Sequence, residues 1–194
     1  MKDILERHLR EKVQSPSDKE IEEILGLFEP KQFNKNDFIK RPYTISRNFF
    51  YLIEGSVRSV FLKENGEEIT YKIHEVNSFI TDLLSYRSDE ITPIGFRCIK
   101  KTDLLVASQD AVHQLLKTNL ALNIAYREVL TKKLVEVGNS YMKFLTGNSK
   151  ERYDFILKNY PDYFKNLPLK YIASLIGVTP TQLSRLRNEN SKKA

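Results

Sequence analysis

The chain is poor in the residues that form covalent cross-links and metal clusters. Cys98 is the only cysteine among 194 residues, which excludes an internal disulfide, an iron–sulfur cluster held by thiolates and a cysteine zinc site. We interpret Cys98 as a small buried hydrophobe. The histidines His8, His74 and His113 do not have ligand spacing, so we expect no metal site and no metal cofactor.

Long apolar runs are also missing. No stretch approaches the length of a membrane span, and the charged start of the chain lacks the apolar core of a signal peptide. We therefore expect a cytoplasmic protein with no membrane partner. The remaining composition, 41% apolar and 29% charged, is typical of a globular chain with one sizeable core and a small appendage, so we expect two domains.

No arrangement of residues indicates catalysis. The sequence offers no identifiable nucleophile with a neighbouring base, no carboxylate pair expected in a cleft and no metal-ligand spacing, so we do not expect an enzyme. Glu67 and Glu68 are adjacent acids, but they lie beside a turn signal and are interpreted as a solvated turn.

The first two thirds of the chain predict a helix followed by short strands. Ser17 and Glu20 form a capping-box pattern ahead of apolar residues at helical spacing. From Phe33 to about Ala107 the sequence favours an antiparallel β-structure, and Asn65-Gly66 predicts a hairpin with a type I′ turn. The expected strands contain Phe38–Ile39, Phe49–Ile53, Val57–Leu62, Ile69–Ile73 and Leu104–Val106.

A long helical stretch follows, from about residue 110 to about residue 145. Its apolar residues recur at spacings of four, three, four and three, which is the pattern of a heptad-like seam. One interpretation is a helix that lies on its own β-domain, and the other is a homodimer interface. The seam residues are Leu130, Leu134, Val137, Tyr141 and Phe144.

The C-terminal segment Leu169–Arg187 predicts a helix-turn-helix. Gly177 suits the tight turn, Thr179 can cap the second helix, and Pro180 fits its first helical position. Leu183 and Leu186 are expected to point inward. The expected DNA-contacting residues are Thr179, Pro180, Thr181, Gln182, Ser184, Arg185 and Arg187 on the second helix, with Lys170 on the first.

The charge distribution supports DNA as the partner of this segment. Residues 150–194 hold nine basic and four acidic side chains, a net charge of +5, whereas residues 1–149 carry only +1. Lys170 and Lys192 are interpreted as contacts to phosphate. The alternative is a helical hairpin with a purely structural role.

The order of these elements resembles the Crp/Fnr family of bacterial transcription regulators. The resemblance covers nearly the whole chain, and the best local matches are Phe50–Arg58 and Ile172–Arg187. It implies an α+β fold: an antiparallel β-roll (a double-stranded β-helix, jelly-roll-like) with flanking helices, a long dimerisation helix and a C-terminal all-α helix-turn-helix domain. The implied domains are 1–147 and 148–194, and the implied partners are double-stranded DNA, a second copy of the chain and RNA polymerase.

The segment matching the family's phosphate cassette departs from its pattern. Ser78, Thr81, Asp82 and Thr92 occupy the expected effector pocket, but no arginine lies at the second element, and Arg87 and Arg97 are out of register. We therefore expect an effector other than cyclic AMP, or none. The alternatives are a cyclic-nucleotide-responsive regulator and a β-roll that binds a ligand or a protein without DNA.

Overall fold

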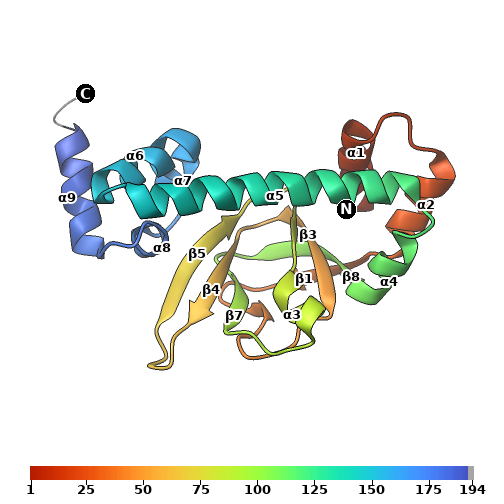
Figure 1. The fold of residues 1–194 in the computed structure, drawn as a ribbon, viewed down its shortest axis with the longest axis horizontal. Coiled ribbons are helices and arrows are strands. Elements are labelled where there is room, and N and C mark those ends of the chain that lie inside the picture. The colour runs from red at the N-terminus through yellow and green to blue at the C-terminus, as the bar shows by residue number, and fades with distance from the viewer. Residues whose placement is uncertain (192–194) are drawn as a thin grey trace.

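The computed structural model describes residues 1–191, so Lys192 lies outside the described residues. Two sheets of four antiparallel strands form the body of the molecule, with strand orders β1-β8-β3-β6 and β2-β7-β4-β5 (Figure 1). The expected antiparallel β-roll is therefore present. Its strands are β1 (Glu29–Phe33), β2 (Phe38–Lys40), β3 (Asn48–Glu54), β4 (Val57–Leu62), β5 (Glu68–His74), β6 (Ser78–Ile80), β7 (Ile94–Cys98) and β8 (Thr102–Ser108).

Each strand run expected from the sequence lies in one of these strands, but β1, β6 and β7 had not been predicted. β1 contains Pro30, forms the edge of its sheet and is exposed over most of its length. It also places the start of the β-structure at Glu29 rather than at Phe33. Strands without alternation of apolar and polar residues give no periodic signal in the sequence.

The hairpin between β4 and β5 confirms the predicted turn but corrects its type. The backbone N–H of Gly66 donates to the carbonyl of Lys63 at 3.0 Å, and Lys63 N–H donates to the carbonyl of Glu67 at 3.0 Å. Gly66 has a φ of +81°, whereas Asn65 does not have a positive φ, so this is not the type I′ turn that requires both. Glu68 begins β5 and is half-buried, so it is not part of a solvated turn.

Helices flank the roll on one side and at both ends. The capping box at Ser17 and Glu20 is formed, but α1 (Lys2–Lys12) precedes the helix that it starts. The helix expected over about 110–145 is two helices, because Asn119 accepts a hydrogen bond from Leu122 N–H and starts α5 afresh. The helices are α1, α2 (Asp18–Gly26), α3 (Leu83–Ser88), α4 (Gln109–Leu115), α5 (Leu120–Thr146), α6 (Ser149–Asn159), α7 (Pro161–Asn166), α8 (Leu169–Leu175) and α9 (Pro180–Ser191).

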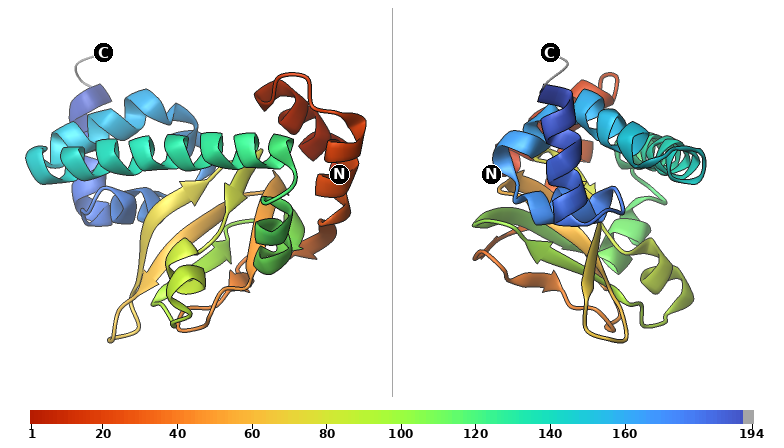
Figure 2. Two further views of the ribbon diagram at one scale, coloured as in Figure 1. Left: turned by 45° about the vertical axis from the view of Figure 1, so that its right-hand side comes forward. Right: turned by 90° about the vertical axis from the view of Figure 1, so that its left-hand side faces the viewer.

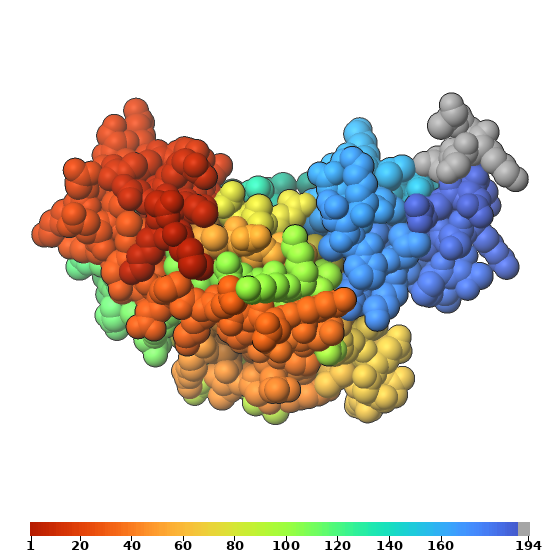
Figure 3. Space-filling model, turned by 180° about the vertical axis from the view of Figure 1, so that it is seen from behind, coloured from red at the N-terminus to blue at the C-terminus, as the bar shows by residue number. Residues whose placement is uncertain are grey.

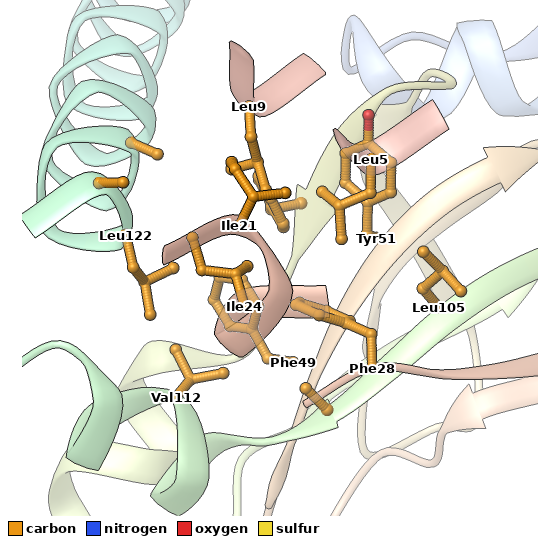
Figure 4. Close-up of a cluster of buried hydrophobic side chains, with 14 of the residues drawn as sticks. Leu5, Leu9, Ile21, Ile24, Phe28, Phe49, Tyr51, Leu105, Val112 and Leu122 are labelled. Carbon is orange, nitrogen blue, oxygen red and sulfur yellow. The ribbon is translucent and has the colours of Figure 1, made fainter. Parts of the chain in front are cut away.

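The main core lies where the N-terminal helices and the start of α5 cover the roll. Figure 4 shows side chains from α1, α2, α4, α5 and the strands converging there. Tyr51 is fully buried and its hydroxyl lies 2.6 Å from His8 Nδ1. Cys98 is 1% exposed within the roll, as predicted. Core residues drawn in Figure 4 include Leu5, Leu9, Ile21, Ile24, Phe28, Phe49, Leu105, Val112 and Leu122.

The N-terminal and C-terminal helices lie at opposite ends of the molecule. α5 runs along the roll, with α1 and α2 at its beginning and α6 to α9 gathered at its end (Figures 1 and 2). The view from behind shows the two helical groups separated by the roll (Figure 3). Within residues 1–191, no helix has the length and apolar character needed to span a membrane.

Candidate nucleic-acid interface and sensor region

The turn between α8 and α9 is tightly defined. Val178 N–H donates to the carbonyl of Ala173 at 2.9 Å, and Gly177 N–H donates to that of Ser174 at 3.1 Å. These two bonds form a Schellman motif, which requires the left-handed φ of +68° at Gly177. A Cβ at this position would also lie 3.3 Å from the ring of Phe144. The backbone conformation therefore favours the glycine that was predicted to make the turn, and a Cβ would also crowd Phe144.

The start of α9 is capped as the sequence predicts. Thr179 Oγ1 accepts a hydrogen bond from Gln182 N–H at 3.2 Å, and Thr179 N–H donates to the Gln182 side chain at 2.8 Å. Pro180 is the first helical residue. The Gln182 side chain, expected to contact DNA, is thus also used to close the cap.

The side chains of α9 divide into a buried and an exposed face. Leu183 is fully buried and Leu186 packs against the same cluster. The exposed residues on the opposite face are Thr179, Pro180, Thr181, Gln182, Ser184 and Arg185. Arg187 is half-buried and has a partner within the molecule, which differs from its expected outward position. Lys170 on α8 is exposed, with its ammonium 5.2 Å from the ring centroid of Tyr171.

Arg152 fixes this helix pair to the end of α5, a role that no local pattern in the sequence indicates. Its Nε donates to the carbonyl of Ile176 at 2.8 Å and its Nη1 to that of Gly147 at 2.7 Å. Its guanidinium also lies 5.2 Å from the ring centroid of Phe144. Phe144, expected in a dimer seam, therefore also contacts the α8–α9 turn of its own chain. A capping box of Asn148 and Glu151 starts α6 beside this site.

The apolar seam of α5 is exposed in the single chain. Leu134 is 74% exposed, while Leu130, nearer the core, is 36% exposed. The neighbouring apolar residues Val135, Met142 and Leu145 are exposed as well. A run of large, exposed apolar side chains along one helix is a feature of interaction surfaces. The other seam residues, Val137, Tyr141 and Phe144, are exposed by 58–61%.

The expected effector pocket contains a buried ion pair. Lys40, on β2, places its ammonium 3.1 Å from Asp82 Oδ2, and both residues are almost fully buried. The same ammonium donates to Thr92 Oγ1 at 3.1 Å and to the carbonyl of Ile94 at 2.6 Å. Thr92 in turn donates its hydroxyl proton to Asp82. The three donors of Lys40 therefore have three acceptors inside the protein.

Asp82 also accepts a hydrogen bond from Ser85 N–H at 3.1 Å and so caps α3. The structure thus brings together Asp82 and Thr92 of the four expected pocket residues and adds Lys40, which sequence reasoning missed. Ser78 donates its hydroxyl to the carbonyl of Glu75 at 2.5 Å. Thr81 Oγ1 is buried and has no hydrogen-bond partner within the described residues.

Two further basic groups are largely shielded from solvent, His74 on β5 and Lys133 on α5. His74 Nε2 lies 2.7 Å from Ser59 Oγ, and burial lowers the pKa of His74 well below its ordinary value. Lys133 donates to the carbonyl of Phe79 at 2.7 Å, and burial, with a smaller effect of Lys72, lowers the pKa of Lys133 to about 8. Burial therefore disfavours the charged form of both groups.

Comparisons with known proteins find relatives by structure rather than by sequence. Neither a protein-family model nor a curated protein sequence matches the chain. FixK2 from Bradyrhizobium japonicum is 13% identical, with 86% of this chain and 85% of that chain covered and a TM-score of 0.71. CooA from Carboxydothermus hydrogenoformans, in a mutant form, is 16% identical, with 96% and 88% covered and a TM-score of 0.71.

A third solved structure is the regulator CLP from Xanthomonas campestris, described as responsive to c-di-GMP. It is 17% identical, with 91% of this chain and 93% of that chain covered and a TM-score of 0.70. CLP is described as a global regulator. The resemblance indicated by the sequence is confirmed at the level of the fold: this chain has the fold of the Crp/Fnr family regulators, with a cyclic-nucleotide-binding-like β-roll.

Proposed function

We propose that this protein is a DNA-binding transcription regulator that acts as a homodimer. Residues 148–194 are its helix-turn-helix domain, and residues 1–147 are an effector domain with the dimerisation helix. The observation that carries the proposal is the capped helix α9, whose exposed face presents Thr181, Ser184 and Arg185 beyond the tight turn at Gly177. A helix of this kind enters the major groove with its N-terminal residues at the base edges.

Charge and exposure support both parts of the proposal. The net charge of +5 on residues 150–194 favours contact with phosphates. The exposed seam on α5 favours a second copy of the chain, because a single helix-turn-helix reads few base pairs and such modules act as symmetric pairs. Two copies would present two α9 helices to two half-sites.

Arg185 is the residue that we expect to read a base. Its fork of donors matches the two acceptors of guanine in the major groove. Arg185→Ala should weaken specific binding by about 1–3 kcal/mol and relax the preference at one base position in each half-site. Fluorescence anisotropy with a series of single-base variants of the selected duplex measures both effects.

Lys170→Ala is the matched control for Arg185→Ala. Lys170 is exposed and is assigned to phosphate, so its loss should weaken binding to all sequences alike and make the salt dependence less steep. If Arg185→Ala weakened all duplexes equally, its assignment as a base reader would be wrong.

The effector domain, we infer, does not bind cyclic AMP. The sequence has no arginine at the second element of the cassette, and the cation beside Asp82 is Lys40, which is paired with Asp82 and hydrogen-bonded to Thr92 and Ile94. A phosphate could reach that ammonium only by displacing a buried carboxylate that repels it. Pro93 also lacks an amide donor that would compensate.

Isothermal calorimetry and thermal unfolding with cyclic AMP or cyclic GMP test this inference. At about a millimolar nucleotide we expect no binding heat and no stabilisation, because a ligand at or below its dissociation constant adds less than about half a kcal/mol. Saturable binding at micromolar nucleotide would contradict the inference and would show that the Lys40–Asp82 pair opens.

A further inference from the structure

Helix α8 lies against β5, the edge strand of the sheet β2-β7-β4-β5. The side chain of Ser174, on α8, forms hydrogen bonds with both backbone groups of Thr70, on β5. Its Oγ accepts a hydrogen bond from Thr70 N–H at 2.7 Å and donates to the carbonyl of Thr70 at 3.3 Å. The Ser174 hydroxyl therefore satisfies the polar backbone groups of Thr70 that a neighbouring strand would otherwise pair.

A second contact joins the same two elements. The guanidinium of Arg58, on β4, lies 4.3 Å from the ring centroid of Tyr171, on α8, and Arg58 is only 4% exposed. Arg58 Nη1 donates to Thr70 Oγ1 at 3.0 Å and its Nη2 pairs with Glu68. Glu68, on β5, also pairs with Arg97 Nη1, on β7, at 2.7 Å. The guanidinium of Arg58 is therefore held in place by Glu68, which Arg97 orients in turn.

Apolar packing completes the contact. Ile73 on β5 and Ile99 beyond β7 belong to the same buried cluster as Ile172 and Ile176 of the α8 segment. The roll thus meets α8 through a hydrogen-bonded edge, a cation over a ring and a shared apolar cluster. Each of these three contacts joins residues of one proposed domain to residues of the other.

The orientation of α9 follows from that of α8, because the Schellman turn at Gly177 connects them rigidly. In Figure 1, α9 lies at the end of the molecule, beyond the roll. Its residues Thr181, Ser184 and Arg185 are exposed. The docked arrangement therefore leaves the DNA-contacting face open.

We propose that Ser174 and Tyr171, held by Thr70 and Arg58 of the roll, are positioning residues for DNA recognition. They fix α9 relative to α5 and so set the distance and angle between the two recognition helices of a dimer. This inference rests on the proposed function. None of the four residues needs to touch DNA for the effect.

Fixing α8 on the roll matters more for specific than for non-specific binding. Two half-sites are bound together only if both helices are already oriented, since ordering a mobile module on DNA reduces affinity. Contacts to phosphate are long-ranged and tolerate rotation of the module. Weakening the contact between α8 and the roll should therefore lower the ratio of specific to non-specific affinity, while the salt dependence of binding stays unchanged.

The test compares Ser174→Ala and Tyr171→Leu with the conservative variants Ser174→Thr and Tyr171→Phe, all in the full chain. The probes are a duplex recovered by selection from a random pool and a random-sequence duplex of equal length. We expect Ser174→Ala and Tyr171→Leu each to lose about three- to tenfold in affinity for the selected duplex. Binding of the random duplex should be unchanged, and Tyr171→Phe, which keeps the ring, should behave as wild type.

Hydrogen exchange at the Thr70 amide reports docking without DNA. Ser174→Ala should speed exchange at this amide, which loses its acceptor, and Ser174→Thr should restore protection. Unchanged exchange in Ser174→Ala, or unchanged affinity for the selected duplex in both disruptive variants, would overturn the positioning role alone. If the wild-type protein failed to distinguish the two duplexes, the proposed function itself would fail, and the positioning role with it.

Discussion

Leu134→Asp should convert the protein from a dimer to a monomer. Leu134 is 74% exposed in the single chain, so an aspartate there meets water and should not disturb the fold of the monomer. In a dimer joined along α5, the same aspartate would be buried against the partner helix without a counter-charge, which costs several kcal/mol at each of two symmetric positions. Sedimentation velocity measures the mass, and circular dichroism checks the fold.

The loss of the dimer should also abolish tight binding to a two-fold operator. A monomer gives up the second half-site, and the gain from linked binding is on the order of 100- to 10,000-fold. Asn139→Asp is the matched control, because it adds the same charge at an exposed position of α5 outside the seam. An unchanged dimer in Leu134→Asp would rule out this seam as the interface.

Asp82→Ala should be among the most destabilising single substitutions in the effector domain. It would leave the ammonium of Lys40 buried without its carboxylate and would remove the cap of α3 at Ser85 N–H. Breaking a buried pair in this way costs about 3–5 kcal/mol. Urea unfolding followed by circular dichroism measures the change in the free energy of unfolding.

The double variant Lys40→Met with Asp82→Leu tests whether the unpaired charge of Lys40 causes this loss of stability. Replacing both partners with apolar residues of similar size removes the unpaired charge, so the double variant should recover much of the stability that Asp82→Ala loses. A loss of less than about 1 kcal/mol in Asp82→Ala would mean that Lys40 finds another partner or water, and the pocket would then be more open than the structure indicates.

Local signals in the sequence predicted the turn between α8 and α9 well, whereas α7 was not predicted. Gly177, Thr179 and Pro180 act within a few residues of where they stand, because caps and tight turns depend on nearby backbone groups. The same holds for the capping boxes at Ser17 and Asn148. The break between α4 and α5 was not predicted, because Asn119 is also compatible with the interior of a long amphipathic helix.

The centre of the effector domain could not be predicted in the same way. Lys40 and Asp82 are 42 positions apart, and only the strand order of the roll brings them together. Arg58 and Glu68 looked like ordinary charged residues of a hairpin, yet they support Tyr171 on α8. Such contacts depend on tertiary packing, and the local periodicity of the sequence does not indicate them.

Selection of bound duplexes from a random pool tests the central proposal most directly. A homodimer with two α9 helices should enrich sequences with two-fold symmetry, with half-sites about one helical turn, roughly 34 Å, apart. In the Arg185→Ala variant, the base preference should be lost at one position in each half-site. Recovery of no preferred sequence, or of a preferred sequence without two-fold symmetry, would contradict the account of this protein as a dimeric operator-binding regulator.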